Sequence, residues 1–140
     1  MDRELYIVDD SPDHQFLLYK LIKGMEMPYL VKFFENGRSL HKHLQQLSRS
    51  EDHARFPDLL VLDLNMPAMN GIELLRLLRQ PPLASHPRIS TLPIVVMSND
   101  ISPTQMHQCY QAGANAVIVK PLSVTVMKNT IQSICKFWMN

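Results

Sequence analysis

Four short apolar runs, each followed at once by a polar residue, constrain the fold of this 140-residue chain more than any other feature. The runs cover residues 5–8, 59–62, 94–97 and 117–119, and polar and apolar side chains do not alternate along them. Runs of this kind are typical of a parallel sheet that has helices on both faces. A fifth candidate strand, residues 29–34, contains a lysine and is expected at an edge of the sheet.

Segments with helix signals separate these runs. Ser11 with Pro12, and Ser102 with Pro103, each predict an N-cap followed by a first-turn proline, and Gly113 is expected to end the second of these helices. Three more helices are expected over residues 39–47, after Gly71, and from about residue 123 onward. The alternation of five strands and five helices predicts a single doubly wound parallel α/β domain over residues 1–140.

Two connections are longer than the roughly 2 to 6 residues usual in such folds. They cover residues 48–58 and residues 80–92, and the second contains three prolines. We expect a tolerated surface insertion at residues 80–92, with a contact surface as the alternative.

Composition excludes several classes of protein. Fourteen Lys and Arg residues against thirteen Asp and Glu residues give a formal net charge of +1, so we expect no nucleic-acid or membrane partner. No apolar run approaches the roughly 18 residues of a membrane span, and no signal peptide is recognisable. The two cysteines, Cys109 and Cys135, form no CxxC pair and are expected to be buried thiols. These features favour a cytoplasmic protein.

Polar side chains follow the four strong strands at their carboxyl ends. Asp9 and Asp10 follow the first, Asp63 the second, Ser98 the third and Lys120 the fourth. The carboxyl ends of parallel strands lie along one edge of a sheet, where ligands of such folds bind. Three carboxylates repel one another unless a cation lies between them, and oxygen ligands without His or Cys favour Mg²⁺. The set predicts a receptor for a transferring phosphoryl group, with Asp63 as the nucleophile.

In this order and spacing, the residues resemble the receiver domain of bacterial two-component response regulators over almost the whole chain. The resemblance rests on the Asp9 and Asp10 pair, on residues 62–71 around Asp63, on Ser98, and on Lys120 with the proline after it. It implies a flavodoxin-like five-stranded sheet with strand order 2-1-3-4-5. It also implies a phosphoacceptor signalling protein and not a conventional enzyme.

The same resemblance implies roles for the site residues. Asp63 would accept a phosphoryl group from a sensor histidine kinase, while Ser98 and Lys120 contact that group. The ligands of Mg²⁺ would be Asp9, Asp10, Asp63 and the backbone carbonyl of Asn65. The chain length and the long connection over residues 80–92 look like those of stand-alone, phytochrome-associated regulators. Output would then pass to a protein target, or to a second copy, through the face made by the helix after Ser102, the last strand and the last helix.

Two departures from the family pattern keep a second reading open. Val117 stands where receivers commonly have Tyr or Phe as a switch residue, and Asn99 stands where a small residue is common. The alternative is a phosphorylation-independent, receiver-like binding module. A metal-dependent phosphatase is a further rival, but Asn65 stands where such enzymes place an acid/base carboxylate. The six histidines have no metal-ligand spacing, and we expect all of them to be solvated.

Overall fold

Five parallel strands form one sheet in the order β2-β1-β3-β4-β5. The computed structural model describes residues 3–25, 29–50, 55–66 and 69–139. The strands are β1 (Arg3–Val8), β2 (Tyr29–Phe34), β3 (Leu59–Leu62), β4 (Ile94–Ser98) and β5 (Ala116–Val119). The predicted flavodoxin-like order is therefore confirmed, and the expected edge position of β2 is confirmed with it.

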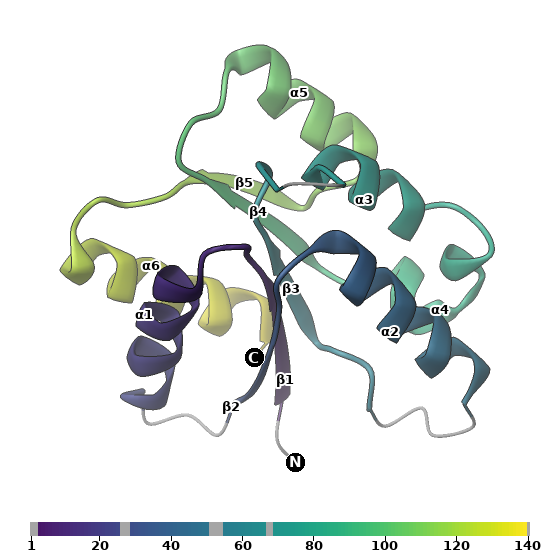
Figure 1. Cartoon of the computed structure of the whole chain (residues 1–140), viewed down its shortest axis with the longest axis horizontal. Coiled ribbons are helices and arrows are strands. Elements are labelled where there is room, and N and C mark those ends of the chain that lie inside the picture. Colours follow the sequence, from purple (N-terminus) through teal and green to yellow (C-terminus); the bar gives the residue numbers. More distant parts are fainter. Residues whose placement is uncertain (1–2, 26–28, 51–54, 67–68, 140) are drawn as a thin grey trace.

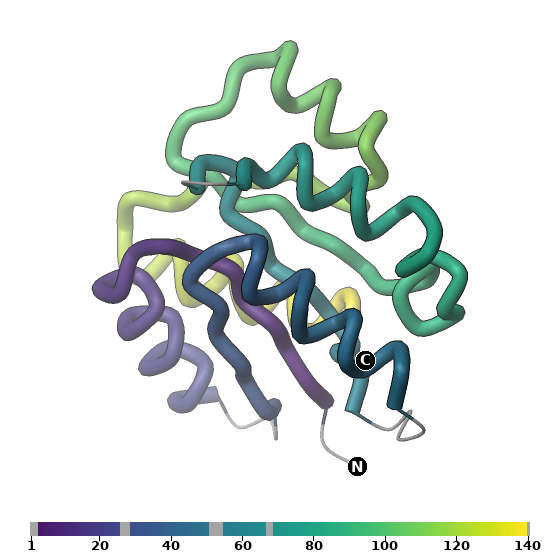
Figure 2. Tube along the Cα trace, turned by 45° about the vertical axis from the view of Figure 1, so that its right-hand side comes forward, coloured from purple at the N-terminus to yellow at the C-terminus, as the bar shows by residue number. Residues whose placement is uncertain are grey.

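Helices cover both faces of the sheet (Figures 1 and 2). They are α1 (Pro12–Lys23), α2 (Gly37–Arg49), α3 (Gly71–Leu78), the 3-10 helix η2 (Leu83–Ser85), α4 (Pro87–Ser90), α5 (Pro103–Ala112) and α6 (Val124–Met139). Along β1, Leu5 and Ile7 point into the core beneath α1 and α6, whereas Tyr6 and Val8 point into the core beneath α2, α3 and α5. Burial on both faces explains why the strands lack polar alternation.

The helix ends that short sequence motifs predict are confirmed for α1 and α5. The Ser11 hydroxyl accepts from the N–H of His14 at the start of α1, and Gly113 ends α5 with φ of 111°. In α2 the cap is Asn36, whose side chain accepts from the N–H of Ser39, so that helix begins before the expected residue 39. An asparagine followed by glycine is equally typical of a turn, so the sequence pattern does not indicate that the helix begins here.

The expectation of a plain surface insertion over residues 80–92 is wrong. The segment contains η2 and α4, and Leu83, Ile89 and Leu92 are buried in the same core as α2 and α3. The segment therefore extends the core near the amino end of β4. Within the other long connection, residues 51–54 lie outside the described part of the chain.

The structure also tests the expectations for the two cysteines and for a membrane span. Cys109 and Cys135 are both buried, as predicted. Among the residues that the structure describes, no helix is long and apolar enough to cross a membrane.

Candidate functional site

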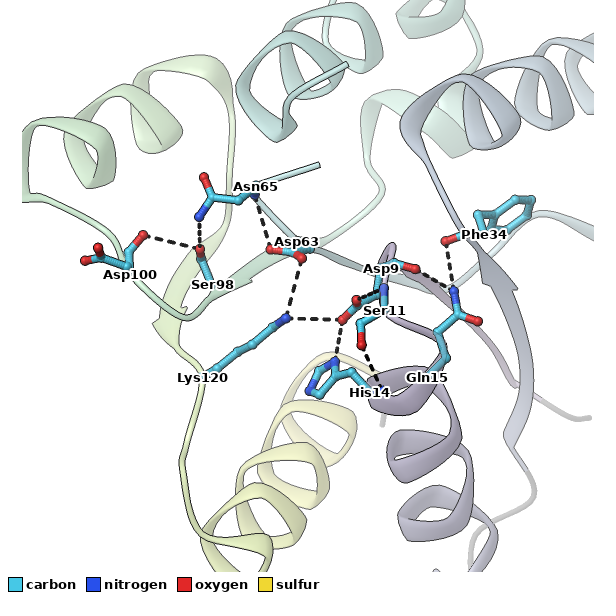
Figure 3. A network of polar contacts seen from close by, with 10 residues as sticks. All are labelled: Asp9, Ser11, His14, Gln15, Phe34, Asp63, Asn65, Ser98, Asp100 and Lys120. Atoms are coloured by element: carbon cyan, nitrogen blue, oxygen red, sulfur yellow. Dashed lines mark hydrogen bonds and ion pairs between the residues drawn. The ribbon is translucent and has the colours of Figure 1, made fainter. Parts of the chain in front are cut away.

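The backbone of the sheet carries the predicted site residues to one edge (Figure 3). The N–H of Asp9 donates to the last carbonyl of β2 at 3.0 Å, and that of Asp63 donates to the last carbonyl of β1 at 2.9 Å. The N–H of Lys120 donates to the last carbonyl of β4 at 2.8 Å. Each residue thus continues the strand ladder by one step, which fixes its backbone relative to the neighbouring strand.

Three carboxylates and one ammonium group meet at this edge. One carboxylate oxygen from each of Asp9, Asp10 and Asp63 lies within 4.8 Å of the others. The Lys120 Nζ lies 3.2 Å from Asp9 Oδ2 and 3.5 Å from Asp63 Oδ2. Asp9, Asp63 and Lys120 are buried, whereas Asp10 is exposed and faces the solvent side. With three negative charges against one positive charge, the cluster favours a divalent cation.

The two buried carboxylates differ in their electrostatic surroundings. Burial raises the pKa of Asp63, and the nearby Lys120 offsets this rise only in part. Burial acts on Asp9 in the same direction, but hydrogen bonds from His14 and the Ser11 N–H, together with Lys120, hold its pKa below the usual value. Asp9 is therefore the more firmly ionised of the two.

Ser98 is fully buried at the end of β4, and its hydroxyl is engaged away from Asp63. The Oγ accepts from the Asn65 side-chain amide at 3.1 Å and donates to the Asp100 carbonyl at 3.4 Å. Asn65 is exposed, and its backbone N–H donates to Asp63 Oδ1 at 3.2 Å. The hydroxyl, the amide and the carboxylate thus form one connected network (Figure 3).

Sequence reasoning missed His14, and the expectation that all histidines are solvated is wrong. The His14 Nδ1 contacts Asp9 Oδ2, and only 16% of the side chain is exposed. His43 is also engaged, because its Nε2 lies 2.9 Å from the Tyr6 hydroxyl. One feature of the sequence indicates that His14 lies near the site. It stands in the first turn of a helix whose N-cap, Ser11, directly follows the two aspartates. His53 lies outside the described residues.

The position of Val117 shows a further detail that the sequence did not suggest. Its backbone N–H donates to the Tyr110 hydroxyl at 3.2 Å, so an aromatic side chain from α5 reaches the edge strand β5 here. The Val117 side chain itself packs against the core beneath α2, α3 and α5.

Comparison with known proteins decides the family. Residues 5–132 match the family model described as the response regulator receiver domain. This chain belongs to the receiver domain family. The predicted resemblance is thus confirmed. The family is one of phosphoacceptor signalling proteins and not of conventional enzymes, and the acidic triad of this chain is of the kind that holds a divalent metal in receivers.

Individual relatives cover nearly all of the receiver. The response regulator Rcp1 of Synechocystis is 24% identical over 135 residues, which is 96% of this chain and 88% of Rcp1. The phosphorylated cyanobacterial phytochrome response regulator RcpA has a similar fold, with a TM-score of 0.83 and 24% identity over 100% of this chain and 96% of RcpA. The Mn²⁺-bound form of Rcp1 gives a TM-score of 0.79 at 23% identity and covers 97% of this chain and 94% of that one.

Proposed function

We propose that Asp63 accepts a phosphoryl group from a phosphohistidine of a sensor histidine kinase in a Mg²⁺-dependent reaction. The observation that carries the proposal is the position of the Lys120 ammonium, within 3.5 Å of both Asp9 and Asp63, inside a cluster of three carboxylates. This arrangement offers a nucleophile, positive charge for a phosphoryl group and ligands for a cation in one place.

In the transfer step, an Asp63 carboxylate oxygen attacks phosphorus and the P–N bond of the phosphohistidine breaks. The imidazole keeps the electron pair of that bond and takes up a proton, and Asp63 becomes an acyl phosphate. Lys120 is close enough to turn from the carboxylates to a phosphoryl oxygen. Ser98 would donate its hydroxyl to a second oxygen after leaving the Asp100 carbonyl. Attack of water on the acyl phosphate returns the free aspartate and inorganic phosphate.

The residues present fit a hard divalent cation, because every side-chain ligand offered is an oxygen. The ligands would be Asp9, Asp10, Asp63 and the backbone carbonyl of Asn65. When bound, Mg²⁺ offsets the negative charge of the carboxylates and of the phosphoryl group. The exposed position of Asp10 leaves the cluster open to ions from solvent.

The partners follow from the family and from the exposed surface. We propose a histidine kinase of the phytochrome type as donor, since the chain is similar to Rcp1 and to the phytochrome response regulator RcpA, and we propose that the transfer takes place in the cytoplasm. For output we propose the face made by α5, β5 and α6. Its exposed apolar side chains include Tyr110, Val119 and Phe137, with exposed fractions of 49%, 52% and 75%. A protein target or a second copy of the chain would bind there.

Labelling with acetyl phosphate tests the phosphoacceptor directly. Intact mass spectrometry should show the gain of one phosphoryl group when Mg²⁺ is present and no gain when it is chelated. The Asp63→Asn variant should not label. Asp13→Asn, which removes an exposed carboxylate from the first turn of α1, should label like the wild type.

The outcome also separates the rival functions. A wild-type chain that does not label, while remaining folded, would favour the phosphorylation-independent binding module. A phosphatase is disfavoured by the chemistry at Asn65, since its carboxamide donates to Ser98 and cannot shuttle a proton as a carboxylate does.

A further inference from the structure

We propose that His14 is a positioning residue that fixes which oxygen of Asp9 faces the divalent cation. The proposal rests on the proposed function, because it concerns the metal ligands of that site, and its test measures metal binding and not phosphoryl transfer.

The two carboxylate oxygens of Asp9 differ in how many of their acceptor positions are already occupied. A carboxylate oxygen offers about two acceptor positions. Oδ2 is contacted by His14 Nδ1 and by Lys120 Nζ at 3.2 Å, so both of its positions are used (Figure 3). Among the residues that the structure describes, Oδ1 accepts only from the N–H of Ser11, at 2.9 Å. The remaining acceptor position of Asp9 is therefore on Oδ1, and a cation or its water would be bound there.

The imidazole of His14 is held in a fixed position. The N–H of His14 donates to the Ser11 hydroxyl at 3.2 Å, which ties the residue to the cap of α1. Its Nε2 is buried and has no hydrogen-bond partner among the described residues. The contact of Nδ1 with Asp9 therefore offsets part of the free-energy cost of burying the polar ring. Nδ1 can donate to Asp9 both in the neutral ring that carries its proton there and in the charged ring.

Lys120 would move during the proposed transfer, whereas His14 would keep its place. Lys120 and His14 both line a cavity of about 150 Å³ that also contacts Asn99 and Pro121. When the ammonium turns to a phosphoryl oxygen, Asp9 Oδ2 loses one of its two donors. His14 keeps the other donor in place, so the carboxylate does not rotate and its Oδ1 stays directed at the cation. This is the role that outer-shell hydrogen bonds have in metal sites.

Titration of the unphosphorylated protein with Mg²⁺, followed by calorimetry, tests the proposal without any phosphodonor. His14→Met, which has a similar size and no donor, should bind Mg²⁺ about ten-fold or more weakly than the wild type. His14→Asn should recover most of the affinity, because its side-chain amide can donate from a position close to that of Nδ1. His107→Met, at an exposed position of α5, is the matched control and should bind like the wild type.

The comparison of the two His14 variants distinguishes the loss of a hydrogen-bond donor from a loss of folding. Thermal unfolding identifies any variant that is not folded under the conditions of the titration. Equal Mg²⁺ affinity of His14→Met and the wild type would overturn the proposal, and so would an Asn variant that binds no better than the Met variant. Failure of the phosphotransfer proposal has a different signature, because Asp63 would then not label although the Mg²⁺ affinities still follow this order.

Discussion

The side-chain amide of Asn65 donates to the hydroxyl of Ser98 at 3.1 Å, although the two residues are 33 positions apart in the chain. The same hydroxyl donates its proton to the Asp100 carbonyl at 3.4 Å, so it acts as both an acceptor and a donor in this state. A phosphoryl oxygen on Asp63 would therefore compete with the Asp100 carbonyl for the Ser98 proton, while the Asn65 amide holds the Ser98 oxygen in its present position. Asn65 thus stabilises the state in which Ser98 points away from Asp63.

Removing the Asn65 amide should favour the phosphoryl-bound state. We expect Asn65→Ala to bind the phosphoryl mimic beryllofluoride, in the presence of Mg²⁺, about two- to ten-fold more tightly, since a single hydrogen bond contributes about 0.5–1.5 kcal/mol. Calorimetric titration measures the change. Asn129→Ala on the exposed side of α6 is the control. Unchanged or weaker binding by Asn65→Ala would contradict this account of Ser98.

Gly71 is required by the close approach of α3 to the loop that carries Asp63. A Cβ at this position would lie 2.9 Å from the Leu64 Cα and 3.0 Å from the Asp63 carbonyl oxygen, so the backbone next to the acidic cluster would have to move. We expect Gly71→Ala to lower the free energy of unfolding by about 1–3 kcal/mol and to weaken Mg²⁺ binding. Gly24→Ala meets no atom closer than 3.5 Å and should have little effect in urea unfolding. Equal stability of the two variants would argue against a tight contact at Gly71.

Arg79 ties three segments together at the edge of the sheet opposite to Asp63. Its guanidinium donates at 2.8–3.3 Å to the carbonyls of Gly113, Ile89, Ser90 and Leu92 and to the side chain of Asn115. We expect Arg79→Lys to lose about 2 kcal/mol or more of unfolding free energy, because a single ammonium cannot reproduce this planar set of donors. Arg76→Lys, at an exposed position of α3 just before Arg79, should be neutral. If both lysine variants unfold at the wild-type urea concentration, the hydrogen bonds of Arg79 contribute nothing measurable.

His43 should make stability depend on pH. Burial lowers the pKa of His43, and the charge of Lys32 lowers it further. The unfolded chain therefore binds more protons than the folded chain. The contribution of neutral His43 to the free energy of unfolding is fully present above its pKa of 6.5 in the unfolded chain. It is lost as the pH falls through the lower pKa of His43 in the folded chain.

Urea unfolding of His43→Gln at about pH 7.5 and about pH 5.5 checks this expectation. The glutamine can still contact the Tyr6 hydroxyl but does not titrate, so the variant should lose less stability than the wild type between these two pH values. His107→Gln, at an exposed position, should follow the wild type. A steeper loss in His43→Gln would reverse the assigned direction of the shift.

The sheet and its polar edge could be predicted because their signals are local and their consequence is geometric. Leu59 to Leu62 form a strand as expected, and Asp63 must follow at its carboxyl end. Once the strands are parallel, Asp9 and Lys120 meet this residue without any knowledge of loop structure. Side-chain roles remain predictions at this level, since proximity does not by itself specify the reaction.

Other features could not be predicted because they depend on packing between distant segments. The burial of Leu83 and Ile89 depends on the core beneath α2 and α3, and the proline-rich composition around them is typical of loops. The six histidines have no metal-ligand spacing, and this pattern predicts a solvated side chain at His14. Its partner is a carboxylate five residues earlier, reached because the first turn of α1 folds back over the end of β1.

The anchoring of residues 80–92 has a practical consequence for work with this protein. Leu83, Ile89 and Leu92 hold the segment to the body of the molecule at the sheet edge opposite to the carboxylates, while Ser85 is exposed to solvent. A fluorophore attached through Ser85→Cys would sit on a rigid base and leave the approach of a donor protein unobstructed. Because Cys109 and Cys135 are buried, thiol labelling of the native fold would be directed to that one engineered site.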